Sequence, residues 1–390
     1  MTTECRDVVV VGGGPAGLVA ARGLAAAGHS VVLLEEHPVI GFPVHCTGLL
    51  GFDSFDELCL PRAPIRAVLN RAWFHGPGGD PIAVEADHIR AAVIDRGDFD
   101  AALAGEAAGC GAELRVDARV ESIIVDRAGV SVRIAGDRVP IRARVCVLAC
   151  GANYRFNQTL GLGVASNIVQ SAQAEVPFPL SDHVDVYVGP DLAPQGFGWV
   201  VPFERNGVGA ARVGLMCNHG ARARFAAFAE RIWHDRGLAA DIPEPRVKAL
   251  PLAPAGPTYA ERVIAVGDAA GLVKPSTGGG IYYGLLSGTI AAEVLGDALR
   301  LDLLGRGRLG AYEKRWSDRL RPDIRAGLAF RRLLSRLDER GIRAIFDLAR
   351  VDGVVPLLKQ TGDFNWHRRA VIALLRHSGF RRAVLSSLWR

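Results

Sequence analysis

The chain has 390 residues, of which 49% are hydrophobic and 22% are charged, so a small single module, a disordered protein and a coiled coil are excluded. Its seven cysteines are scattered without zinc-type spacing, which argues against a disulfide framework and a metal site. The net charge of +5 is uneven, because residues 300–390 carry 21 Lys and Arg against 9 Asp and Glu, whereas residues 1–299 are net acidic.

The sequence contains neither a membrane span nor a secretion signal. No apolar run reaches the roughly 18 residues that a transmembrane helix needs. The N-terminal apolar run is preceded by Glu4 and Asp7 and interrupted by glycines, unlike a secretion signal. We therefore expect a cytoplasmic protein that begins near Met1, with reduced thiols.

The first forty residues predict a strand, a glycine-rich turn, a helix and a second strand. The β-branched run 7–11 is typical of a strand buried on both faces of a parallel sheet. It leads into the turn 12–17, a helix over 18–27 closed by Gly28, and a strand over 30–34. This order predicts a dinucleotide-binding unit.

The residue types in this unit explain how it would hold a dinucleotide. Gly12 allows a tight turn, Gly14 lets the backbone approach a pyrophosphate, and Gly17 packs the helix on the strand. The phosphates would face the amides of the helix N-terminus. Glu35, at the end of the second strand and followed by Glu36, can accept hydrogen bonds from a ribose.

Two distant segments favour FAD over a nicotinamide. A predicted strand over 262–266 runs into Gly267 and Asp268, and the glycine-rich stretch 275–281 then opens an apolar helix that extends to Leu295. An aspartate at a strand end can hold a ribityl hydroxyl, and helix amides can face an electron-rich flavin edge. A third sheet strand is predicted over 144–151.

Several of these segments are similar to motifs of a known superfamily. The turn 12–17, the stretch 95–100 and Val-Gly-Asp at 266–268 resemble the two-domain flavoproteins that include aromatic hydroxylases. Two further segments resemble the geranylgeranyl reductase family within that superfamily. Residues 43–48 are similar to its Pro-x-x-Cys-Gly-Gly motif, with Thr47 in place of glycine.

The second reductase-like segment is 197–202, which is similar to the family's aromatic-x-Trp-x-Phe-Pro motif with Val201 in place of phenylalanine. The family's following Gly-x-Gly is not at its usual spacing, since residues 210–214 intervene. Cys150 stands before Gly151 where hydroxylases of the superfamily have aspartate, which counts against a hydroxylase.

The resemblance implies an α/β fold, with a Rossmann-type FAD-binding domain, an inserted antiparallel-sheet substrate domain and C-terminal helices. The short alternating strands that residues 165–255 predict agree with such an insertion. The expected division is an FAD-binding domain of 1–60, 88–160 and 255–300, a substrate domain of 61–87 and 161–254, and a basic helical region of 301–390.

The resemblance and the motifs together give the candidate site residues. The expected FAD-binding residues are Gly12, Gly14, Pro15, Ala16, Gly17, Glu35, Glu36, Cys46, Thr47, Gly48, Arg96, Val120, Gly267, Asp268, Pro275, Gly278, Gly279, Gly280 and Ile281. The expected substrate-binding residues are Phe197, Trp199 and Pro202. An ordinary place in the core of the sheet is the alternative for these aromatic residues.

Cys46 is the candidate catalytic residue, because the family places a cysteine near the flavin. An unperturbed thiol has a pKa of about 8.5 and is a weak proton donor for an alkene, so positioning comes first and chemistry second. A buried, chemically inert thiol is the alternative.

The implied function is FAD-dependent reduction of carbon–carbon double bonds in a polyprenyl, or geranylgeranyl, group on a lipid, quinone or tetrapyrrole. The electron donor, a ferredoxin or NAD(P)H, is left open, because no second dinucleotide fingerprint is present. An FAD-dependent monooxygenase and a flavin electron carrier to a quinone or partner protein are the alternative functions.

The basic C-terminal segment 366–390 has arginines beside apolar residues and ends in Leu388, Trp389 and Arg390, a pattern that predicts a helix pair with one apolar face. Such helices could lie on an anionic membrane, or they could form a cap whose arginines are solvated. No nucleic-acid reader motif accompanies the charge, so no nucleic-acid partner is expected.

Overall fold

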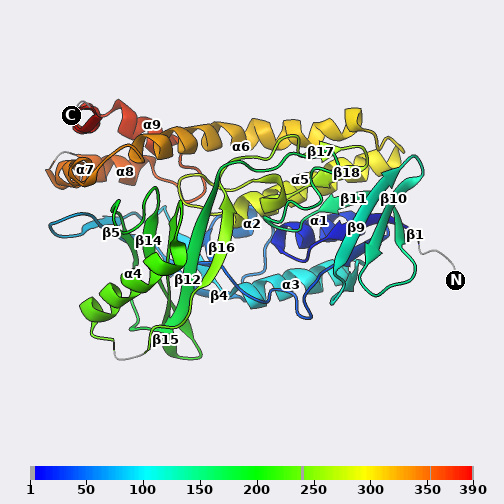
Figure 1. The fold of residues 1–390 in the computed structure, drawn as a ribbon, viewed down its shortest axis with the longest axis horizontal. Coiled ribbons are helices and arrows are strands. Elements are labelled where there is room, and N and C mark those ends of the chain that lie inside the picture. Colours follow the sequence, from blue (N-terminus) through cyan, green and yellow to red (C-terminus); the bar gives the residue numbers. More distant parts are fainter. Residues whose placement is uncertain (1–4, 239–240, 352, 389–390) are drawn as a thin grey trace.

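The computed structural model describes residues 5–238, 241–351 and 353–388. In this part of the chain, two large β-sheets lie one after the other along the long axis of the molecule, and the C-terminal helices run along one side of both (Figure 1). The N-terminus lies at the end occupied by the parallel sheet, and the C-terminal helices reach the opposite end.

The parallel sheet is built around β1, which pairs in parallel with β11 on one side and β2 on the other. Val8, Val9 and Val10 are completely buried, which accounts for the β-branched run in the sequence. The α/β class predicted from the sequence is confirmed. In spatial order the described strands are β17 (Tyr259–Ala260), β18 (Val263–Ala265), β11 (Ile141–Leu148), β1 (Cys5–Val11), β2 (Val31–Leu34) and β8 (Glu113–Arg115), and β10 (Gly129–Ile134) joins β11 to β9 (Val120–Asp126).

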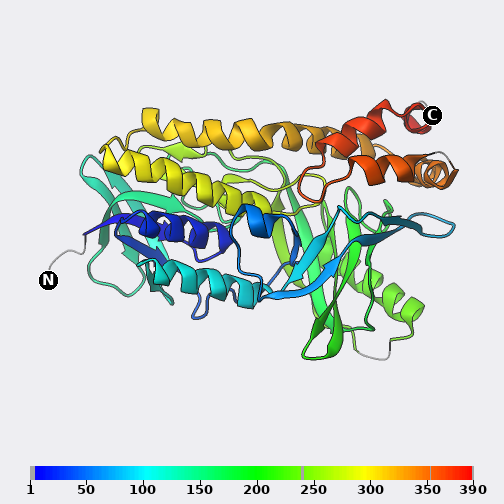
Figure 2. The same ribbon diagram turned by 180° about the vertical axis from the view of Figure 1, so that it is seen from behind.

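Three helices cover one face of this sheet: α1 (Pro15–Ala26) lies between α3 (Arg96–Gly109) and α5 (Ile281–Arg300) (Figure 2). A Cβ on Gly288 of α5 would lie 2.3 Å from the Ala16 carbonyl oxygen, so this glycine is what lets α5 approach α1. The short 3-10 turn Gly267–Ala270 connects β18 to the segment that precedes α5. The N-termini of α1 and α5 are therefore held close together.

The second large sheet is mainly antiparallel, with β13 and β5 as a parallel pair. Helix α4 (Ala221–Arg236) covers one face, where Phe225, Phe228 and Ile232 are buried against β15. On the other face, Val201 and Phe203 are buried in one cluster with Leu69 and Val93. At one edge of that face, Phe74 and Ile82 pack on the C-terminal helices. In spatial order the described strands are β16 (Arg246–Pro251), β12 (Ile168–Pro177), β15 (Val208–Cys217), β14 (Phe197–Arg205), β13 (Val184–Tyr187), β5 (Arg71–His75) and β6 (Ile82–Glu85).

A small antiparallel sheet links the two larger ones. Its strands in the described chain are β3 (Leu49–Gly51), β7 (Ala91–Ile94) and β4 (Ile65–Leu69), and the short helix α2 (Ser54–Glu57) follows β3. The segment 43–48 leads directly into β3, so this strand anchors it at the junction between the two large sheets.

The C-terminal region consists of α6 (Arg306–Leu334), α7 (Glu339–Val351), α8 (Val354–Thr361), α9 (Arg368–Arg376) and α10 (Ser378–Leu388). The apolar faces of α7 to α10 are buried together, with Phe346, Leu374 and Phe380 at the centre, and they pack on Phe74 and Ile82 of the β5–β6 hairpin. Trp389 and Arg390 lie outside the described residues. No helix in the described chain combines the length and the apolar character that crossing a membrane requires.

Candidate active site

One cavity of about 1830 Å3 extends from the β1–α1 turn, past the segment 43–48, to the C-terminal helices. Polar backbone and charged groups line the end next to β1, whereas aliphatic and aromatic side chains line the opposite end. The cavity therefore joins two chemically different compartments in a single space.

The first compartment is a cradle formed by the β1–α1 turn. Gly12 has a φ of +111°, and a Cβ there would lie 2.3 Å from the Ala149 carbonyl oxygen. Gly14 begins α1, is capped by no described side chain, and would have no described atom within 4 Å of a Cβ. The uncapped amides and the open space fit a bound pyrophosphate.

Glu35 lies at the end of β2 and faces the same cradle. Its carboxylate accepts hydrogen bonds from the Gly13 N–H at 2.7 Å and from the His37 N–H at 3.0 Å. These bonds fix the carboxylate beside the glycine turn, where a ribose hydroxyl could bind it.

A second glycine-rich turn faces the first. Asp268, in the 3-10 turn after β18, lines the cavity, and burial raises the pKa of its carboxyl while Lys248 and Arg96 oppose that rise. Gly280 begins α5, also with no cap from any side chain in the described residues, so the helix amides point to the cavity. An aspartate and free amides at this position fit the ribityl chain and ring edge of a flavin.

Arg96 lines the cavity and forms a bidentate ion pair with Asp100, at 3.0 and 2.7 Å. Burial raises the pKa of Asp100, and the guanidinium opposes that rise. Asp95 caps α3 by accepting the Gly97 and Asp98 N–H groups. This capped helix end fixes Arg96 next to the thiol of Cys46.

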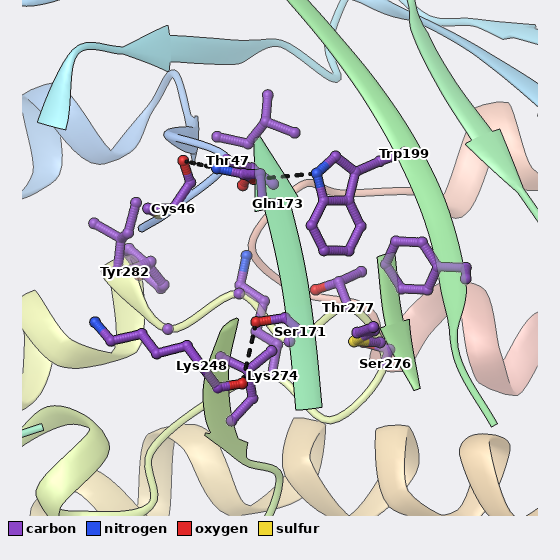
Figure 3. A pocket seen from close by; sticks show the side chains of 18 of the residues that line it. Cys46, Thr47, Ser171, Gln173, Trp199, Lys248, Lys274, Ser276, Thr277 and Tyr282 are labelled. Atoms are coloured by element: carbon purple, nitrogen blue, oxygen red, sulfur yellow. Dashed lines mark hydrogen bonds between the residues drawn. The ribbon is translucent and has the colours of Figure 1, made fainter. Parts of the chain in front are cut away.

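Cys46 is tied to the antiparallel sheet through one glutamine. Its carbonyl oxygen accepts a hydrogen bond from Nε2 of Gln173 at 3.0 Å, and Oε1 of the same amide accepts one from the indole N–H of Trp199 at 3.2 Å. Figure 3 shows Gln173 between the other two residues. The two segments that resemble the reductases are therefore connected through a residue that the motifs did not indicate.

A glycine makes this connection possible. Gln173 on β12 and Trp199 on β14 are both paired with Gly214 on the intervening strand β15. A Cβ on Gly214 would lie 2.7 Å from the indole ring. Because neighbouring strands are about 4.8 Å apart, the indole reaches across β15 only where the central strand lacks a side chain.

Arg212 fixes the other side of the segment 43–48. It is 1% exposed and donates to the carbonyl oxygens of Thr47 at 2.8 Å and Ile94 at 2.9 Å. Its guanidinium lies over the Phe203 ring, and burial lowers its pKa. Gly48 has a φ of +69°, and a Cβ there would lie 2.3 Å from Nη1 of Arg212.

His45 precedes the cysteine and lines the cavity. Its Nε2 is 3.0 Å from Oγ of Ser171, and burial together with Lys248 and Arg246 lowers its pKa to about 4. The imidazole is therefore neutral near pH 7. Lys248 lies next to Ser171 in the cavity lining (Figure 3).

The second compartment is apolar. Phe197 and Trp199 both line it, with ring centroids 5.8 Å apart and an interplanar angle of 62°. Side chains of α6 to α10, including Phe330, Phe346 and Leu374, complete its wall. Sequence periodicity predicted an apolar helix face here, but the described structure turns that face toward the cavity.

A hydrogen-bonded contact joins the segment before α5 to the C-terminal region. Lys274 is 5% exposed and donates to the Phe364 carbonyl at 2.8 Å and to Oδ1 of Asn365 at 3.2 Å. Burial lowers the pKa of Lys274 to about 7, although Asp363 and Asp323 oppose this. Two of the chain's four lysines, 248 and 274, line the cavity. The rarity of lysine in this arginine-rich sequence was therefore a signal that could have indicated these two site residues.

Most of the candidate residues come together around this cavity. Those that line it are Gly12, Gly14, Pro15, Ala16, Glu35, Glu36, Cys46, Thr47, Arg96, Val120, Gly267, Asp268, Gly278, Gly279, Gly280, Ile281, Phe197 and Trp199. Those that do not line it are Gly17, Gly48, Pro275 and Pro202. Sequence reasoning missed Gln173, Arg212 and Lys274. No cluster of His, Cys, Asp or Glu suited to a metal ion occurs in the described residues.

Comparison with known proteins agrees with this geometry. The family model described as lycopene cyclase protein matches residues 7–352. A digeranylgeranylglycerophospholipid reductase of Methanosphaerula palustris is 30% identical over 81% of this chain and 82% of its own length. The chain belongs to the geranylgeranyl reductase family. The resemblance found in its sequence motifs is thereby confirmed.

Solved structures agree with this membership. A geranylgeranyl bacteriochlorophyll reductase-like protein from Thermoplasma acidophilum has 25% identity and a TM-score of 0.84, with 99% of each chain covered. A point mutant of the halogenase PltM, solved in complex with FAD, has 17% identity and a TM-score of 0.71, with 98% of this chain and 85% of the mutant's chain covered. At that identity the halogenase shows that this member of the reductase family shares its fold.

Proposed function

We propose that this protein is an FAD-dependent reductase that saturates carbon–carbon double bonds of a polyprenyl group, carried by a lipid, a quinone or a tetrapyrrole. The observation that carries the proposal is the single cavity in which a dinucleotide cradle opens directly into an apolar compartment. The names of the relatives, which describe reductases of geranylgeranyl groups, support the same substrate class.

The residues around the cradle fit FAD. We assign the pyrophosphate to the amides of the turn that contains Gly12 and Gly14, the adenosine ribose to Glu35, and the ribityl chain to Asp268. The N-terminus of α5 at Gly280 would face the flavin ring. When bound and reduced, FAD supplies the hydride that one alkene carbon needs.

The protein's own residues would position the alkene and keep water away from it. Phe197 and Trp199 present an apolar wall, and an isolated alkene gains most from orientation because it has no polar handle. The bond chain from Trp199 through Gln173 holds Cys46 in place, so we assign this cysteine to positioning of the site. The substrate compartment combines the proposed substrate domain with the C-terminal helices.

The electrons would come from a ferredoxin or from NAD(P)H, and contact with a membrane would bring the lipid. Four exposed arginines of the C-terminal helices have no carboxylate partner among the described residues, and they suit an anionic lipid surface: Arg369, Arg376, Arg381 and Arg382. Their attraction would be electrostatic, because the apolar faces of these helices are buried. Binding to anionic vesicles that salt abolishes is the expected result, and equal binding to neutral vesicles would contradict it.

The test of the function is anaerobic. The purified holoprotein is photoreduced and mixed with a geranylgeranyl lipid, and flavin reoxidation is followed together with the mass of the lipid. Reoxidation with a gain of two hydrogens per double bond supports the reductase. A flavin that stays reduced until oxygen enters would favour the monooxygenase, and rapid reoxidation by a soluble quinone alone would favour the electron carrier.

A further inference from the structure

The end of the cavity farthest from the parallel sheet is formed by two elements that lie side by side, the β5–β6 hairpin and α7 (Figures 1 and 2). Phe74 and Ile82 of the hairpin and Ile342 and Phe346 of α7 line the cavity there. All four side chains belong to one apolar cluster, so these four residues offer hydrocarbon contacts.

Phe346 closes the space between the two elements. Its side chain is 7% exposed, and its ring lies directly on the backbone of Gly76, where a Cβ would come within 2.6 Å of the ring atoms Cγ and Cδ2. Any side chain at residue 76 would therefore displace the ring. The absence of a side chain at Gly76 is what allows the ring to seal the gap.

The outer side of the same contact is polar. Arg350, one turn beyond Phe346, donates to the carbonyl oxygens of Gly78 at 3.2 Å and Asp80 at 2.6 Å, and it also pairs with Asp347. The hairpin turn and α7 are thus joined by hydrogen bonds at the surface, immediately outside the ring. Phe346 lines the cavity, whereas Arg350 and the turn residues Gly78 and Asp80 do not, so on the side of the hairpin turn the ring is the last apolar group before polar ones.

We propose that Phe346 is a specificity-determining residue that ends the substrate compartment and so limits the length of isoprenoid chain that the enzyme accepts. The inference rests on the proposed function, since it assigns this compartment to a polyprenyl chain. A chain whose end meets the ring holds its double bonds in one register relative to the cradle. A longer chain would have to push the ring off Gly76 or withdraw its reacting bond from the flavin.

The experiment compares Phe346→Ala with wild type on a set of lipids that share one head group and carry farnesyl, geranylgeranyl or geranylfarnesyl chains. The compartment of the variant is extended toward the hairpin turn. We expect its preference, expressed as kcat/KM, to shift toward the longer chain by roughly tenfold, the effect that one or two methylenes have on a hydrophobic site. Phe330→Ala is the matched control, because Phe330 also lines the cavity but lies on α6 beside Phe380. Phe330→Ala should lower kcat/KM for all three chain lengths by a similar factor.

An unchanged length preference in Phe346→Ala, or the same shift in Phe330→Ala, would overturn the inference. Phe346→Leu gives a second, milder truncation if the alanine variant does not fold with FAD bound. Affinities for saturated chains of the three lengths, measured by quenching of tryptophan fluorescence, test the wall without any turnover. If wild type bound the saturated chains but reduced none of the three unsaturated lipids, the proposed function would fail, whereas a shift of the affinities of Phe346→Ala toward the longer saturated chain would still support the role of Phe346.

Discussion

The hydrogen-bond chain from Trp199 through Gln173 to Cys46 predicts a measurable coupling between two strands and the cysteine segment. Replacing Trp199 by Phe keeps an aromatic ring beside Phe197 but removes the indole N–H that Gln173 accepts at 3.2 Å. Gln173 is 7% exposed, so its carbonyl would lose a partner in a buried place. Leaving such an acceptor unpaired costs about 1–3 kcal/mol.

If this hydrogen-bond chain positions the active site, its loss would raise the activation free energy and so lower the rate of hydride transfer. A loss of about 1–3 kcal/mol in the transition state corresponds to a decrease of roughly 5- to 150-fold in the rate of hydride transfer. The assay is anaerobic stopped-flow reoxidation of the reduced flavin by a geranylgeranyl lipid, because it isolates the chemical step from reduction by the donor. FAD content and the unfolding transition of each variant show that the fold is retained.

A double-mutant cycle separates coupling from two independent effects. Gln173→Leu removes both hydrogen bonds of the chain, so adding Trp199→Phe to it should cost little more. We expect an interaction energy of about 0.5–3 kcal/mol, the range found for residues in one network. Additive effects, with an interaction energy near zero, would refute the argument that the two side chains act as a unit.

Three further predictions concern glycines and a buried lysine. Gly48→Ala should lower the free energy of unfolding by about 2–5 kcal/mol, because it adds a clash with Arg212 to the strain of a left-handed residue. Gly28 is also left-handed but has no described atom near its Cβ position, so Gly28→Ala should lower the free energy of unfolding by only about 1–2 kcal/mol. Equal losses for the two variants in denaturant titrations would contradict this prediction. Gly14→Ala should leave the free energy of unfolding of the FAD-free protein within about 0.5 kcal/mol of wild type, but should weaken FAD binding at least roughly tenfold in calorimetry. An unchanged FAD affinity would count against the assignment of the pyrophosphate to this turn. Gly105→Ala is the control, because a Cβ there also has no described atom within 4 Å. The unfolded chain keeps the Lys274 proton up to about pH 10.5, whereas the folded chain releases it from about pH 7. Between these pH values the free energy of unfolding of wild type should therefore rise by up to roughly 5 kcal/mol more than that of Lys274→Met. Parallel curves of stability against pH for the two proteins would contradict this prediction.

The sequence predicted those parts of the site that depend on local pattern. A β-branched run, a glycine turn and an acid at fixed spacing specify a strand, a helix N-terminus and a strand end, and the structure puts Gly12, Gly14 and Glu35 around one cradle. The predicted helix boundary was less accurate: α1 begins at Pro15, three residues before the predicted start. Proline supplies no donor to the first turn and is well suited to that position, which the hydrophobic period alone does not reveal.

The contacts that hold the site together could not be predicted, because they depend on strand register. Gln173 is one of several polar residues of β12, and Arg212 is the one charged residue of β15. Nothing near them in the sequence distinguishes them from solvent-facing positions. They become functional only because β15 pairs with β12 and β14, so that Gly214 lies between Gln173 and Trp199. Arg212 and Gly214 lie two residues apart on β15: Arg212 donates to the Thr47 carbonyl, and Gly214 is paired with both Gln173 and Trp199.

The C-terminal helices show why periodicity predicts an apolar face but not what covers it. The arginines at 368–382 are exposed and Val371, Leu374 and Phe380 between them are buried, as amphipathic helices require. The same pattern would result from a helix lying on a membrane, because both environments remove the apolar face from water. What decides between them is the β5–β6 hairpin, which is about 260 residues earlier in the chain than α7 and supplies Phe74 and Ile82 to the same cluster. The cavity between hairpin and helices takes the place that lipid would have, so the inner face of the basic region lines the cavity, whatever its outer arginines bind.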